Sequence, residues 1–129
     1  MPDGRRIEVV LDVHPAFGLL LLPLQVGADQ VFMFISGSPM SGIAPGSWGD
    51  LLLKEHLIYP DAPGSSHRLD HLRIGGEPVP PIEVRQSRRA GRFRLDGELG
   101  LNFFRNFREA CFQMPADPNA PIVLSLELL

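Results

Sequence analysis

Proline and glycine interrupt this chain so often that little room is left for long regular elements. Thirteen prolines and thirteen glycines are spread over 129 residues, and the apolar runs between them are short. Short apolar runs separated by turn residues are typical of β-strands, whereas sustained helical spacing is nearly absent. The pattern therefore predicts an all-β protein built from many short strands.

The first part of the chain is predicted to form consecutive strands. Residues 6–13 place apolar side chains at every second position, as a strand with one buried face does. A second strand is expected within residues 17–26 and a third over residues 31–35, with a tight turn at residues 27–30 between them. Two later strands are expected at residues 82–85 and 122–129.

One segment carries helical spacing. Phe103, Phe107 and Cys111 recur every four residues, which predicts a helix over residues 101–111 with one apolar face. Cys111 would then be a buried and inert thiol, and as the single cysteine it has no partner for an intramolecular disulfide. A short helical turn is also expected within residues 43–54.

The length and the net charge of the chain limit the class of protein that it can be. No repeat or linker divides the chain, so we expect a single domain over residues 1–129. The formal charge of −3 argues against nucleic-acid binding, and no hydrophobic run is long enough to cross a membrane. We expect no nucleic-acid or membrane partner, and a cytoplasmic location, because no secretory signal is apparent.

Residues 85–94 contain five arginines. A nucleic-acid-binding patch is one interpretation of such a segment. We favour a solvated hairpin end instead, because Phe93 is the one aromatic residue between these charges on which a base would stack.

Residues 31–43 run from an apolar strand directly into a turn of small residues, Ser36-Gly37-Ser38-Pro39. Abrupt turns after strands are common places for catalytic residues. This turn offers no acid or base and no nucleophile stronger than a serine hydroxyl, and no nearby histidine would activate one. The serines are better suited to satisfy backbone groups of the turn itself.

Taken together with residues 96–107, this stretch resembles the retropepsin-like aspartic proteases, the single-lobed relatives of pepsin. That family has a strand ending in Asp-Thr-Gly-Ala/Ser, and much later an Asp-Gly-Ile-Leu-Gly-x-Asp-Phe-Leu type segment that opens a short helix. Residues 34–43 are similar to the first motif and residues 96–107 to the second, and the resemblance covers residues 20–128. It implies a closed β-barrel with one short C-terminal helix.

The chain departs from the family at the residue that would do the chemistry. The resemblance puts Ile35 at the position of the catalytic aspartate, and an isoleucine can neither accept a proton nor orient water. Ser36 matches the bracing threonine or serine and Gly37 the backbone-permissive glycine. The resemblance thus implies a degenerate active-site turn of Ile35, Ser36, Gly37 and Ser38 in a pseudoenzyme, with Glu98 replacing an apolar residue of the second motif.

Asn102 stands where the family often has Asp or Asn, and we expect it to make structural hydrogen bonds. The resemblance also implies a homodimer with Ser36 at the two-fold interface. We therefore expect a non-catalytic domain that dimerises or binds a peptide or protein ligand, for example by strand addition.

The sequence leaves two other chemistries to consider, hydrolysis by non-standard residues and metal binding. An active hydrolase using non-standard residues, such as Asp96 or a histidine, is the alternative function, although Asp-Gly is first of all a turn signal. His67 and His71, with Asp70 and His56, would form a metal site only on a helix, and we favour a solvated loop. We expect no metal and no cofactor.

Overall fold

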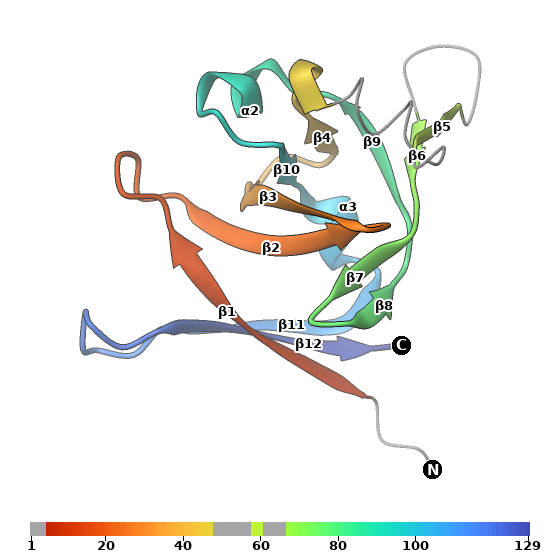
Figure 1. Ribbon diagram of the computed structural model, residues 1–129. Coiled ribbons are helices and arrows are strands. Elements are labelled where there is room, and N and C mark those ends of the chain that lie inside the picture. The colour runs from red at the N-terminus through yellow and green to blue at the C-terminus, as the bar shows by residue number, and fades with distance from the viewer. Residues whose placement is uncertain (1–4, 48–57, 61–66) are drawn as a thin grey trace.

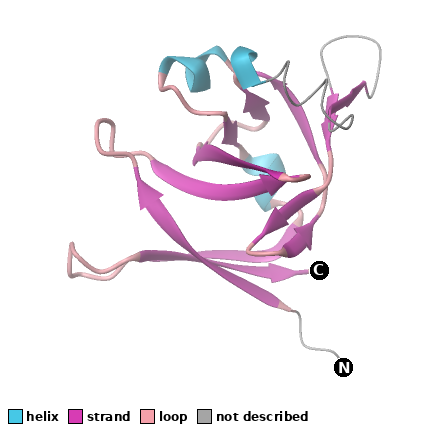
Figure 2. Cartoon of the chain, viewed as in Figure 1, coloured by secondary structure: helices cyan, strands magenta, loops and turns pink. Residues whose placement is uncertain are grey.

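The computed structural model describes residues 5–47, 58–60 and 67–129, and Figure 1 shows the arrangement of their elements. The protein is mostly β, with few short helices, as Figure 2 makes clear. The strands are β1 (Arg6–Val13), β2 (Leu20–Val26), β3 (Asp29–Ile35), β4 (Ser41–Ile43), β5 (Ile58–Pro60), β6 (His67–Leu69), β7 (Leu72–Ile74), β8 (Glu77–Val79), β9 (Ile82–Gln86), β10 (Gly97–Leu99), β11 (Phe107–Gln113) and β12 (Ile122–Leu128). The helices are α2 (Arg88–Arg92) and α3 (Leu101–Phe104), and residues 45–47 are also helical.

Neighbouring strands follow the order β11-β12-β1-β2-β3-β10-β4-β9-β6-β5, with β7 and β8 attached to β2. The path includes two parallel pairs, β3 with β10 and β4 with β9, while β4 and β10 run antiparallel. Hydrogen bonds between the described strands do not close this path into a ring. The predicted β-rich fold is therefore confirmed, but the closed barrel is not.

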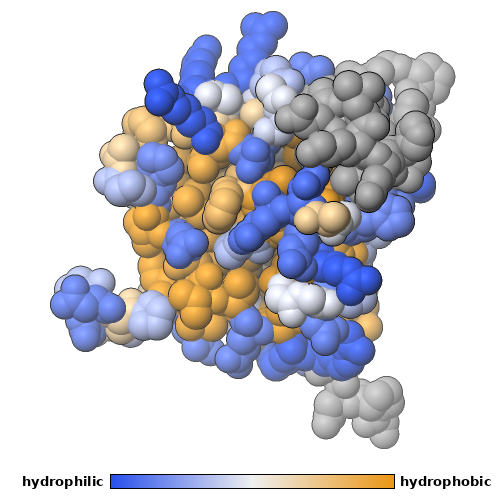
Figure 3. Space-filling model, viewed as in Figure 1, coloured by the Kyte–Doolittle hydropathy of each residue, from blue (hydrophilic) through white to orange (hydrophobic). Residues whose placement is uncertain are grey.

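The two faces of β2 and β3 contribute to different cores. Val31 and Met33 belong to the main core, which also takes side chains from β1, β9, α3 and β12. Phe34 and Leu21 pack instead with Ala90 of α2 in a smaller cluster. Figure 3 shows apolar surface remaining over β1–β3 on the viewed face.

The sequence prediction for the C-terminal helix was wrong in length. Helix α3 ends at Phe104, and residues from Phe107 onward form β11 instead. Phe103 and Phe107 do pack together, with ring centroids 5.3 Å apart, but they do so across the turn between helix and strand. Cys111 is exposed on β11 rather than buried, and its hydrogen bond to the Glu109 carboxylate raises the pKa of the thiol.

The arginine-rich segment is also not the hairpin end that we predicted. It forms α2, because the Ser87 hydroxyl caps the helix by accepting a hydrogen bond from the backbone N–H of Ala90 (3.1 Å). The side chain of Ala90 is fully buried and fixes the helix against the smaller core. The arginines of the segment therefore have defined positions relative to β9 and β10.

Three glycines allow β10 and its neighbours to approach one another closely. A Cβ at Gly100 would lie 2.5 Å from the carbonyl oxygens of Ser38 and Met40, and a Cβ at Gly97 would meet the carbonyl oxygen of Gly42. A Cβ at Gly42 would itself lie 2.7 Å from the Cβ of Ser87. The Ser36–Met40 turn therefore passes so close to the β10–α3 junction that residue 100 must be glycine.

Replacing Gly100 by alanine tests this crossing. Because the new Cβ would press on two backbone oxygens that have little freedom to move, we expect Gly100→Ala to lower the free energy of unfolding by about 1–3 kcal/mol. Urea denaturation followed by circular dichroism measures the change.

Gly46→Ala is the matched control, because no described atom lies within 4 Å of a Cβ at Gly46. This control should be neutral or should stabilise by up to about 1 kcal/mol. Equal effects of the two substitutions would contradict the proposed steric requirement.

Candidate functional site

The Ser36–Met40 turn is fastened to the β10–α3 junction by backbone hydrogen bonds. The N–H of Ser36 donates to the carbonyl of Leu99 (2.9 Å), which extends the parallel pairing of β3 with β10. The N–H of Leu101, at the start of α3, donates to the carbonyl of Ser38 (2.8 Å). The two motifs that the sequence analysis paired are thus in direct contact.

The four residues of the predicted degenerate turn occupy different environments. Ile35 ends β3, is half-buried and packs against the main core. The Ser36 hydroxyl accepts a hydrogen bond from the N–H of Ser38 (3.2 Å), so it satisfies the turn as expected. Gly37 is exposed, has no positive φ, and would leave a Cβ with no described atom within 4 Å. The expected need for a permissive backbone at Gly37 is therefore wrong.

Asn102 is confirmed as a structural hydrogen-bonding residue. Its Oδ1 accepts from both the N–H (2.9 Å) and the hydroxyl (2.7 Å) of Ser41, and its Nδ2 donates to the carbonyl of Glu83 (2.8 Å). The Ser41 hydroxyl also accepts from the N–H of Gly100 (2.9 Å). Asn102 thereby holds β4 and β9 to the helix that follows β10.

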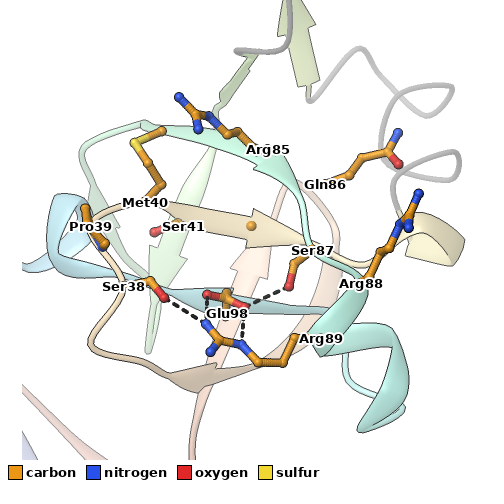
Figure 4. A pocket seen from close by; sticks show the side chains of 11 residues that line it. Ser38, Pro39, Met40, Ser41, Arg85, Gln86, Ser87, Arg88, Arg89 and Glu98 are labelled. Atoms are coloured by element: carbon orange, nitrogen blue, oxygen red, sulfur yellow. Dashed lines mark hydrogen bonds and ion pairs between the residues drawn. The ribbon is translucent and has the colours of Figure 1, made fainter.

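The dominant polar feature of the site is the carboxylate of Glu98, which comes from β10 and has 6% of its side chain exposed. Arg89 of α2 binds it with both Nε (3.2 Å, to Oε2) and Nη2 (2.8 Å, to Oε1). The hydroxyls of Ser87 (2.7 Å) and Ser36 (3.2 Å) also donate to it. Figure 4 shows Arg89 reaching toward Glu98 from one side while Ser87 approaches from another.

These donors determine the protonation state of Glu98. Burial by itself would raise the pKa of the carboxyl group, but the hydrogen bonds from Arg89 and Ser87 and the positive charge of Arg89 outweigh it and lower the pKa below its ordinary value of 4.5. The same contact raises the pKa of Arg89. Glu98 is therefore an ionised carboxylate with its acceptor positions occupied.

An open cavity of about 510 Å³ lies between the turn and the β9–α2 segment. Its walls come from residues 38–42 on one side and residues 85–89 on the other, with Glu98 between them. Arg85, Arg88 and Arg89 all line it. No histidine is among the described residues that line the cavity, so none of these residues would activate a serine there as a nucleophile.

The alternative catalytic groups lie elsewhere. Both oxygens of Asp96 accept hydrogen bonds, from the N–H of Phe32 and the hydroxyl of Ser47 (2.8 Å each), so Asp96 holds the start of the β3–β10 contact. His67 lies in a strand and His71 lies in the following turn with a φ of 59°, so the helical spacing required for a metal pair is not formed. His56 lies outside the described residues. Among those described, no group of three or more potential metal ligands occurs.

The Glu98–Arg89 pair was not predicted from the sequence as the centre of the site. A signal was present, because Glu98 is a charged residue in a short strand whose other positions are apolar or glycine. A buried carboxylate needs a partner of opposite charge or hydrogen-bond donors. Arg89 lies nine residues earlier, but its role depends on α2, which the analysis did not predict.

Comparison with known proteins identifies the fold. No protein-family model and no curated protein matches the chain. Among solved structures, the chain is similar to a retropepsin-like aspartic protease from Rickettsia conorii, with a TM-score of 0.63, 12% sequence identity, and coverage of 99% of this chain and 96% of that one. The protein therefore has a retropepsin-like fold, and at this identity the likeness concerns the fold alone.

Within the described part of the chain, no helix has both the length and the apolar character needed to cross a bilayer.

Substituting Glu98 tests how much its ion pair and hydrogen bonds contribute to the stability of the fold. Glu98→Gln keeps the shape of the side chain but removes the charge that Arg89 binds, and we expect it to lower the free energy of unfolding by about 1–3 kcal/mol at neutral pH. Glu109→Gln is the control, because the Arg6–Glu109 pair is about half exposed and should contribute much less. A loss for Glu98→Gln no larger than for Glu109→Gln would contradict this role.

The stabilisation by Glu98 should depend on pH. A carboxyl group whose pKa is lowered in the folded state contributes its full stabilisation above the unfolded-state pKa of about 4.5 and loses it as the pH falls through the lower folded-state pKa. The difference in unfolding free energy between the wild type and Glu98→Gln should therefore shrink as the pH is lowered below about 4.5. A constant difference from neutral to acid pH would contradict the lowered pKa.

Proposed function

We propose that this protein is a non-catalytic retropepsin-like domain that binds a peptide or protein segment in the cavity beside the Ser36–Met40 turn. The observation that carries the proposal is the state of the one carboxylate among the described cavity-lining residues: Glu98 is paired with Arg89 and bound by two serine hydroxyls. Ile35, at the family's acid position, has no ionisable group.

Aspartic proteolysis requires a different arrangement. Two carboxyl groups close together share one proton, and the ionised member takes a proton from water as it attacks the peptide bond. Glu98 has a lowered pKa, and its charge is neutralised by a guanidinium group, which makes it a weak base. The cavity is therefore suited to holding a ligand rather than to activating water.

The same proposal includes a homodimer formed through the turn. Gly37 and Pro39 are exposed at its tip, and Ile35 beneath them is apolar and half-buried. A second copy facing this turn would meet Ile35 in place of a carboxylate, without the desolvation cost of a carboxylate pair. The single domain over residues 1–129, the closed barrel and the cytoplasmic location stay predictions.

A proteolysis assay tests the absence of catalysis. We expect no cleavage of unfolded casein between about pH 3 and pH 7, because no acid of the cavity is free to activate water. Mass spectrometry of the casein after incubation measures this. Cleavage that disappears in Asp96→Asn would instead establish the alternative, an active hydrolase that uses Asp96.

A bulky substitution at Gly37 tests the dimer. Because a Cβ at Gly37 has open space in one copy, we expect Gly37→Trp to keep the melting temperature of the monomer while it lowers the dimer fraction in sedimentation velocity at micromolar concentration. Gly46→Trp is the control at another exposed glycine with open space. A wild-type protein that sediments as a monomer would contradict the dimer.

A further inference from the structure

Three arginines and one carboxylate line the cavity, in a chain whose formal net charge is −3. Resting on the function proposed above, we propose that the cavity binds an acidic peptide segment, and that Arg85 and Arg88 provide the charges that recognise its carboxylates.

The arginines of the cavity have different roles. Arg89 already has partners within the protein, because its guanidinium group binds Glu98 and also donates a hydrogen bond to the hydroxyl of Ser38 (2.7 Å). Arg85 and Arg88 are exposed and form no ion pair with any described carboxylate. Figure 4 shows their guanidinium groups pointing away from Glu98, on either side of Gln86. Their charges are therefore available to a ligand.

The fold holds these two arginines at fixed positions. Arg85 belongs to β9 and pairs with Gly42 of β4, and Arg88 begins α2 directly after its Ser87 cap. Gly42 allows the strand and the helix to approach closely, since a Cβ there would collide with Ser87. A pair of guanidinium groups on short, anchored elements loses less freedom on binding a carboxylate than a pair on a mobile loop would.

The lining favours a peptide over a nucleic acid. Pro39 and Met40 add apolar surface beside the arginines, which suits the mixed side chains of a peptide. No aromatic ring is among the described lining residues, so a base would have no stacking platform there. A volume of about 510 Å³ is enough for a few side chains of an extended segment.

Fluorescence anisotropy with a labelled peptide of alternating Glu and Ala residues tests the proposal. We expect the wild-type protein to bind this peptide and to bind a matched peptide with Gln in place of Glu at least about tenfold more weakly, because carboxylates are the recognised groups. The double variant Arg85→Glu/Arg88→Glu should weaken binding of the Glu peptide by at least about tenfold. Circular dichroism would verify that the variant stays folded.

Arg92→Glu is the matched control, because Arg92 lies on the same helix but does not line the cavity. It should change the affinity by less than about twofold. An equal loss for Arg92→Glu, no binding of the Glu peptide by the wild type, or tighter binding of poly-uridylate than of the Glu peptide would each overturn the proposal.

Mass spectrometry of the bound Glu peptide separates this proposal from the proposed absence of catalysis. A peptide that binds through Arg85 and Arg88 but is cleaved would overturn the non-catalytic function and leave the recognition of acidic segments standing. Failure of the Glu peptide to bind, with casein left intact, would overturn the recognition of acidic segments alone.

Discussion

The buried carboxylate of Glu98 connects three parts of the chain that lie far apart in sequence. Strand β10 carries it, Ser36 reaches it from the turn after β3, and Ser87 and Arg89 reach it from the start of α2. A buried carboxylate without these partners would be costly, so the turn, the strand and the helix depend on one another for their positions. The close crossing at Gly42 and Gly100 makes such contacts geometrically possible.

The same network also organises the candidate site of this retropepsin-like fold. The turn keeps its contact with the β10–α3 junction, and Asn102 holds β4 and β9 against that junction. The Glu98–Arg89 ion pair lies at the centre of this site. In the function that we propose, these polar residues stabilise the fold, while Arg85 and Arg88, which form no ion pair with a described carboxylate, bind the ligand.

Much of the strand pattern could be predicted from the sequence, but the details of the site could not. Alternation and turn residues located β1 and β12 well: β1 has one buried face, and Leu124 and Leu126 of β12 enter the main core, although Ser125 between them is buried too. The phenylalanine spacing after Leu101 was mistaken for a long helix, since aromatic residues also suit the strand that follows α3. Helix α2 depends on the Ser87 cap and on the burial of Ala90, which the sequence pattern did not reveal. Because this helix places Arg89 beside Glu98, their ion pair could not be predicted without it.

The pKa of Glu98 tests the central claim most directly. A ¹³C NMR titration that follows the side-chain carboxyl carbon of Glu98 reports its protonation without changing the protein. We predict one titration step below the ordinary value of 4.5, because Arg89 and the serine hydroxyls stabilise the ionised form. A pKa raised above 4.5, or two coupled steps such as a proton-sharing pair produces, would contradict the ion pair and the proposal, which rests on it, that the site is non-catalytic.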